Sequence, residues 1–428
     1  MRSNFYRLSR IFLISCLLIG ALATSNQLQA QYLLNSDSAF RAGTPNSGRI
    51  WGYVFADYFH KSHSDSLNRG GNNQYTNVKQ GQDEFQFRRI YLGYDYNISK
   101  TFSAEFLFAA EDDFAGGDLL QNNKFTPYIK NANLRWKNFL FKGNDFVFGL
   151  QPTPSFPFMS ETIFTYTRPV ERTITDIRRT PSFDFGAALQ GRFNSKDNKV
   201  TYGYNFLVAN GTSAKPQALN GSLYKWFYFD AFVGFFNRHL VIDYYADYQR
   251  QNWTPVAHQH ASRQMNKLVV AWTSPKFTVG AEGYVNNLQQ VEVGTRATGK
   301  DTLDGHASGI SFYVHGNIIG EKLRFFARYD LYNPNTKYDN GTYSKYAALY
   351  TVSTSYEPNN KERFFNVGLD FSPVKNIRIM PNIWYNKYLG QQANLTGSAS
   401  HDYDLVYRLT FYFNFGKMYA NPSYTYYH

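Results

Sequence analysis

Six charged side chains lie close together between residues 152 and 182, in a segment that is also rich in proline. They are four arginines and two acids: Arg168, Glu171, Arg172, Asp176, Arg178 and Arg179. Rings of Arg or Lys at the narrow part of an aqueous passage attract and select small anions. Proline favours an ordered, stiff segment. The alternative is a solvated loop in which these charges pair with one another.

A second set of charges recurs at alternate positions of strand-like segments, which would place its members on one face of a sheet. The basic members are Arg88, Arg89, Arg135, Arg192, Arg324, Arg328, Arg378 and Arg408, and the acidic members include Glu105, Asp230, Asp243, Asp247, Asp330 and Asp370. Such a face could form a path for anions, or its charges could form ion pairs that brace a wall. Because both signs are present, the predicted face is mixed rather than uniformly basic.

Other candidate sites are weaker. His258 and His260 form a His-x-His pair that is more typical of a hydrated turn than of a metal site, and residues 111–118 (EDDFAGGD) lack the ordered ligand spacing of a calcium loop. The sequence has no Gly-x-Ser-x-Gly elbow, no phosphate-binding loop and no His-Glu-x-x-His pair. We therefore expect no catalytic activity, no cofactor and no metal site.

The element that would position these charges is a strand with two unlike faces. Residues 403–416 show it most clearly, because Leu405, Tyr407, Leu409, Phe411, Phe413 and Phe415 alternate with Val406, Arg408, Thr410, Tyr412 and Asn414. A period of two predicts a β-strand.

Sixteen such segments can be placed along the chain. They cover residues 49–60, 85–96, 102–111, 128–137, 145–151, 183–193, 200–210, 223–236, 240–251, 264–272, 277–286, 309–319, 323–333, 362–371, 377–388 and 403–416. Short connections such as 97–101 alternate with long ones such as 61–84, 152–182, 287–308 and 334–361. An even strand count with short periplasmic turns and long external loops is typical of bacterial outer-membrane barrels. The predicted fold class is all-β, a 16-stranded antiparallel transmembrane β-barrel.

One segment breaks the alternation. In residues 85–96 (FQFRRIYLGYDY), strict alternation would place either Arg88 or Arg89 on the lipid-facing side, where a charge costs about 2–4 kcal/mol at the membrane midplane. A β-bulge, which inserts one extra residue, would turn both arginines toward the interior. A soluble β-sandwich or a secreted β-solenoid is the competing fold, and neither requires the alternation of short and long connections.

The N-terminus predicts export. Arg2, Arg7 and Arg10 precede an apolar run at 11–23, and the small residue Ala30 marks the expected cleavage site of a signal peptide spanning residues 1–30. Cys16 loosely fits a lipoprotein cleavage box, but the apolar run continues past it. The remaining chain would be free of cysteine, with 41 basic and 32 acidic residues and a formal charge of +9.

The rest of the chain is divided into a periplasmic N-terminal segment at 31–48, the barrel at 49–416 and a C-terminal tail at 417–428. Aromatic residues make up 18% of the chain, which suits a barrel with Tyr and Trp at the membrane interfaces. The positive charge does not indicate nucleic-acid binding, because the predicted chain is exported and faces lipid.

Four stretches resemble the phosphate-selective porin O and P family, of which this chain would be a divergent member. They are residues 83–114, 149–156, 168–193 and 324–334. The resemblance implies a sixteen-stranded, trimeric diffusion channel narrowed by inward loops, and the arginine-rich pore of that family would correspond to Arg168, Arg172, Arg178 and Arg179. The sequence departs from the family in lacking an evident run of lysines on those loops, and in continuing past Phe415 to His428.

We therefore expect a porin of the bacterial outer membrane that contacts lipid and lipopolysaccharide. It would assemble as a homotrimer and pass small hydrophilic solutes, with a bias toward phosphate or other small anions. The competing function is a plugged barrel that serves as a structural or secretion-accessory component.

Overall fold

The structure is a computed structural model of the chain. It describes residues 45–69, 73–111, 120–121, 124–125, 127–155, 163–166, 169–178, 181–211, 224–253, 260–337, 339, 341–343, 345–348, 361–389 and 401–415. The expected signal peptide and the expected C-terminal tail therefore lie outside the described residues.

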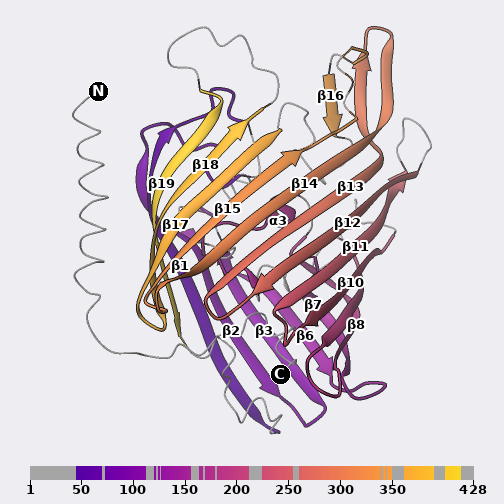
Figure 1. Ribbon diagram of the computed structural model, residues 1–428. Helices are drawn as coiled ribbons and strands as arrows, with labels where there is room; N and C mark the ends of the chain where they lie inside the picture. The colour runs from indigo at the N-terminus through magenta and orange to yellow at the C-terminus, as the bar shows by residue number, and fades with distance from the viewer. Residues whose placement is uncertain are drawn as a thin grey trace.

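Sixteen antiparallel strands close into one barrel (Figure 1). Each strand pairs with the next one along the wall, and β1 closes the ring by pairing with both β2 and β19. The wall strands are β1 (Ser47–His63), β2 (Asp83–Asn97), β3 (Phe102–Glu111), β6 (Tyr128–Trp136), β7 (Asn144–Pro152), β8 (Phe183–Asn194), β9 (Thr201–Ala209), β10 (Trp226–Phe235), β11 (Leu240–Trp253), β12 (His260–Thr273), β13 (Phe277–Arg296), β14 (Gly299–Ile319), β15 (Leu323–Asn333), β17 (Glu362–Val374), β18 (Ile377–Tyr388) and β19 (Tyr403–Phe415).

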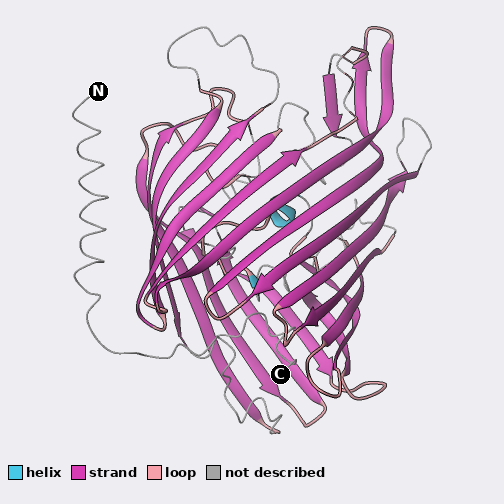
Figure 2. Cartoon of the chain, in the orientation of Figure 1, coloured by secondary structure: helices cyan, strands magenta, loops and turns pink. Residues whose placement is uncertain are grey.

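The remaining described elements are short. Strands β4 (Leu120–Gln121) and β5 (Lys124–Phe125) pair with each other, and β16 (Lys345–Ala348) adds to β13 beyond the wall. A single-turn helix, α3 (Ile174–Arg178), lies in the connection between β7 and β8. Figure 2 shows how fully strands dominate the described chain. None of the helices among these residues has the length and apolar character needed to cross a bilayer.

The alternation of the sequence becomes an alternation of burial. In β19, Arg408, Thr410 and Tyr412 are buried, whereas Phe411 and Phe413 are about 40% exposed on the outside. The same pattern holds in β11, where Asp243 and Asp247 are buried. An apolar exterior around a closed barrel is what contact with lipid requires. The chain is therefore an outer-membrane β-barrel of sixteen strands, as the sequence predicts.

The predicted bulge in β2 is confirmed by the pairing with β1. Phe55 lies opposite Arg89 and Ala56 lies opposite Phe87, so Arg88 is the extra residue. As a result Phe85 is 83% exposed on the outer face. Arg88 is buried, and Arg89, opposite the inward-facing Phe55, is half-buried.

One predicted loop is wrong. The sequence indicated a long loop at 287–308, but β13 continues to Arg296 and β14 begins at Gly299, so this segment is an extended hairpin that stands above the rim (Figure 1). Its strands alternate poorly, because both faces are solvated above the membrane. A register shift between Leu288 and Glu292, with Gln290 in the left-handed region at φ 54°, separates the hairpin from the wall.

Candidate constriction site

The chain between β7 and β8, residues 153–182, is called loop 3 here, and its described part lies inside the barrel. Phe164 packs on Tyr313 of β14 with ring centroids 4.5 Å apart, and Tyr166 stacks on Phe326 of β15 at 4.6 Å. Both loop rings are buried. Helix α3 begins directly after Thr173. The Oγ1 of Thr173 accepts a hydrogen bond from the amide of Asp176 at 3.2 Å, which makes Thr173 the N-cap residue. Loop 3 therefore has a packed position in the interior.

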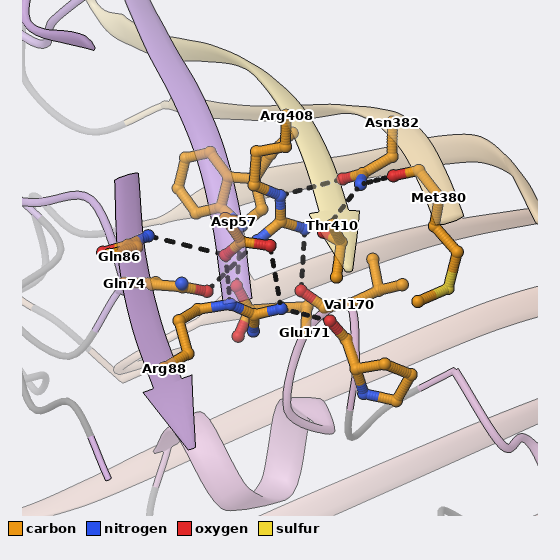
Figure 3. Close-up of polar contacts among 12 residues, drawn as sticks. Asp57, Gln74, Gln86, Arg88, Val170, Glu171, Met380, Asn382, Arg408 and Thr410 are labelled. Carbon is orange, nitrogen blue, oxygen red and sulfur yellow. Dashed lines mark hydrogen bonds and ion pairs between the residues drawn. The ribbon is translucent and has the colours of Figure 1, made fainter. Parts of the chain in front are cut away.

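Wall arginines bind the backbone of loop 3 at four successive carbonyl groups, and Figure 3 shows the contacts made by Arg88 and Arg408. Arg88 of β2 donates to the carbonyl of Pro169, and Arg408 of β19 donates to that of Val170 at 2.7 Å. Arg328 of β15 donates to the carbonyls of Glu171 and Arg172, at 3.4 and 2.5 Å. Hydrogen bonds from a charged donor are stronger than neutral ones. Three strands that are far apart in sequence thus hold one short stretch of loop.

Glu171 adds a side-chain attachment. Its carboxylate is buried and accepts a hydrogen bond from Trp384 Nε1 of β18 at 2.7 Å. Burial by itself would raise the pKa of Glu171, but the guanidinium groups of Arg172, Arg408 and Arg328, together with the Trp384 bond, outweigh it and hold that pKa below its ordinary value. Glu171 is therefore ionised and fixed to the wall.

Several arginines of the wall have acidic partners. Arg88 pairs with Asp57 of β1, and Arg328 forms hydrogen bonds to both oxygens of Asp330. Asp370 Oδ2 forms ion pairs with Arg378 Nη2 at 2.7 Å and with Arg324 Nη2 at 2.9 Å. Buried charges need such partners, since an unpaired charge in a low-dielectric interior is very costly. These pairs brace the barrel from within.

The predicted site residues therefore fall into groups of different accessibility. Arg88, Arg135, Arg328, Asp243, Asp247 and Glu171 are buried, whereas Arg89, Arg172, Asp176, Arg192 and Arg324 are half-buried. Arg168 and Arg179 lie outside the described residues, and only the backbone of Arg178 is described. Among the predicted site residues whose side chains are described, only the half-buried group keeps appreciable exposed side-chain surface.

Sequence reasoning missed several charged pairs of the inner wall, among them Lys61–Asp404, Arg49–Asp95 and Lys130–Glu111. Lys130 of β6 forms an ion pair with Glu111 of β3 and a 3.1 Å hydrogen bond with Tyr91 Oη. Strict alternation would turn Lys130 outward with Leu134, but the β3–β6 register skips it, because Ile129 lies opposite Phe108 and Asn131 opposite Leu107. A lysine on the lipid-facing side was the signal in the sequence that could have revealed this second bulge.

In the described part of the chain, His, Cys, Asp and Glu side chains nowhere gather in a group of three or more that could hold a metal ion. His260 belongs to β12, but its side chain and all of His258 lie outside what is described, as does most of the 111–118 segment.

Several solved structures share this fold at low sequence identity. The anion-selective porin from Comamonas acidovorans is 12% identical, covers 86% of this chain and 100% of its own, and gives a TM-score of 0.53. OmpF of Salmonella typhi, in complex with daunomycin, is 11% identical, with 86% and 98% covered and a TM-score of 0.54. The outer-membrane channel DcaP of Acinetobacter baumannii is 11% identical, with 89% and 99% covered and a TM-score of 0.57.

These likenesses establish the porin fold. No family model matches the sequence, and no curated protein matches it. The narrower resemblance to the phosphate-selective porin O and P family thus rests on the sequence stretches alone.

Proposed function

We propose that this chain is a passive diffusion channel of the outer membrane for small hydrophilic solutes, narrowed by loop 3. The observation that carries the proposal is the attachment of residues 169–172 to the inner wall by Arg88, Arg328 and Arg408. A loop fixed across the interior narrows the channel. The width of the narrowest part then sets the largest solute that can pass. The proposal includes no catalytic step.

The finer proposal is an anion bias, for phosphate or other small anions, set by Arg168, Arg172, Arg178 and Arg179. It is supported by the sequence resemblance and by the half-buried position of Arg172 on the loop. The wall arginines contribute less to this bias, because Arg88 and Arg328 are buried against Asp57 and Asp330.

Planar-bilayer recordings test both levels of the proposal. The purified chain should give stepwise conductance, and its reversal potential in a KCl gradient should indicate preference for chloride. Arg172→Gln should shift the permeability ratio toward cations, whereas the matched change Arg363→Gln on the exposed outer face of β17 should not. A silent bilayer refutes the channel, and an unchanged ratio in Arg172→Gln refutes the assigned filter.

A plugged structural barrel is the second candidate, and one observation favours it. Inward side chains are fully buried even on strands that carry none of the loop-binding arginines, as for Val147, Leu207, Tyr245 and Met265. Loop 3 reaches this side as well, because Ile174 belongs to the same apolar cluster. Swelling of vesicles in a graded series of sugars separates the two candidates: a channel admits the small sugars, and a plugged barrel admits none.

We also infer that the chain assembles as a homotrimer in contact with lipid and lipopolysaccharide, which the resemblance implies. Chemical cross-linking in native membranes tests the assembly, and a ladder ending at three copies is the expected result.

A further inference from the structure

The chain between β1 and β2, residues 64–82, is called loop 1 here, and it also reaches into the barrel. Tyr75 is fully buried and packs with Phe59, Phe364 and Trp384. Its carbonyl accepts a hydrogen bond from Lys61 Nζ at 2.6 Å, while Asn73 Nδ2 donates to Glu362 at 3.0 Å. Loop 1 is therefore fastened to the wall beside loop 3 rather than extending away from the rim.

Arg408 contacts both loops with one guanidinium group (Figure 3). Its Nη2 donates to the carbonyl of Val170 in loop 3, and its Nη1 donates to Gln74 Oε1 in loop 1 at 3.2 Å. Its Nε donates to Asn382 of β18 at 2.8 Å, which fixes the plane of the group. The rigid fork of an arginine can satisfy three directions at once in this way.

A second bridge runs parallel to the first. The ring of Tyr75 lies edge-on to Trp384, with centroids 5.4 Å apart, and Trp384 Nε1 donates to Glu171 of loop 3. The Tyr75 ring also lies 5.6 Å from the Arg408 guanidinium carbon. Loops 1 and 3 therefore share two wall residues, one charged and one aromatic.

We propose that Arg408 is a positioning residue that couples loop 1 to loop 3, so that the two loops form one constriction and loosen together. Because Arg408 donates a buried hydrogen bond to Val170 of loop 3 and a partly buried one to Gln74 of loop 1, a substitution there leaves acceptors of both loops unsatisfied at the same time. A change made only in loop 1 should then be felt in loop 3. The bore of the proposed channel is accordingly set by both loops.

Amide hydrogen exchange of the full chain in vesicles tests the coupling without requiring conduction. The amides of Val78 in loop 1 and of Val170 and Ile177 in loop 3 are bonded within their own loops and serve as reporters. In Arg408→Gln, exchange at all three should accelerate by about tenfold or more, the scale of a lost charged hydrogen bond. Arg135→Gln is the matched control, since Arg135 is buried like Arg408 but is bonded to Asp145 and Gln190 of the wall.

Tyr75→Ala is the second variant, and it leaves the arginines of the wall in place. Coupling requires faster exchange at Val170 in this variant, with strand amides unchanged. Acceleration confined to loop 1, or equal effects in Arg135→Gln, would overturn the proposal.

Single-channel conductance gives a second test of the coupling, and this test rests on the proposed function. Arg408→Gln should increase single-channel conductance and current noise, whereas an unchanged conductance with faster loop exchange would show that the loops do not set the bore. A native chain that never conducts refutes the channel, and the exchange result still decides the coupling.

Discussion

At the residue scale, three interior arginines mainly hold loop 3 against the wall through hydrogen bonds. Arg88, Arg328 and Arg408 each join the wall to loop 3, and two of them also carry an acidic partner. A guanidinium group suits this role because it remains charged and offers five donors in a fixed plane. Counting arginines along the sequence therefore overestimates the positive charge that a solute would meet.

The Arg88–Asp57 pair allows a stability prediction. Asp57→Asn should lower the free energy of unfolding by about 3–5 kcal/mol, because it leaves a buried guanidinium without its counterion. The double variant Asp57→Asn with Arg88→Gln should lose less free energy of unfolding than the sum of the losses in the two single variants. Asp83→Asn, at an exposed pair on the same two strands, should cost less than about 1 kcal/mol. Urea unfolding in vesicles measures all four variants, and strict additivity would contradict the pairing.

The attachment of loop 3 through Glu171 should weaken in acid. Its folded-state pKa is lowered, so its contribution is fully present above the ordinary glutamate pKa of about 4.3. That contribution is lost as the pH falls through the lower folded value. Protection of the Val170 amide, corrected for the intrinsic exchange rate, should therefore decrease below about pH 4 in the native chain. Glu171→Gln should show less protection and no such pH dependence; a native-like acid transition in that variant would contradict the assignment.

At the element scale, bulges decide which way charged side chains point. A strand has a side-chain period of two, so one inserted residue reverses every position beyond it. In β2 the bulge turns Arg88 and Arg89 inward and keeps Phe85 and Phe87 outside, and in β6 it turns Lys130 inward. The Lys130–Glu111 pair exists only because of this shift.

Deleting Arg88 should therefore harm assembly less than deleting its neighbour Phe87. Deletion of Arg88 removes only the extra residue, so Arg89 still lies opposite Phe55 and Phe87 still lies opposite Ala56. Deletion of Phe87 instead forces either Arg88 or Gln86 onto the lipid-facing side. Heat-modifiable migration on gels, which distinguishes folded barrels from unfolded chain, should show strong loss for the Phe87 deletion and mostly folded protein for the Arg88 deletion. Equal yields would show that Arg88 is not the extra residue of the bulge.

At the scale of the whole molecule, closure of the sheet fixes both the membrane position and the interior. The first and last strands pair along most of their length, from Gly52 opposite Phe415 to Lys61 opposite Val406. Closure leaves no open sheet edge, which a lipid environment demands. It also brings residues from β1, β2, β15, β18 and β19 to the two inward loops. The fold and its apolar exterior place the chain in the bacterial outer membrane.

Depth in the membrane should govern the cost of a charge on the outer face. Leu409 lies at the centre of β19 and Phe415 at its end, both on the lipid side. Leu409→Arg should lower the free energy of unfolding in vesicles by about 2–4 kcal/mol, and Phe415→Arg by about 1 kcal/mol or less. Similar losses at the two positions would argue against this placement of the bilayer.

The sequence by itself determined the wall. Period-two alternation depends only on neighbouring residues, so the sixteen strands, their inward charges and the bulge at Arg88 could be predicted, and the bounds of 102–111, 323–333 and 377–388 agree with the structure. The hairpin above the rim was missed because no lipid imposes alternation there. Only the tertiary structure decided what the inward arginines bind, since Arg88, Arg328 and Arg408 come from strands up to 320 positions apart. Their partners are backbone carbonyl groups of loop 3, which every residue possesses and no sequence pattern marks.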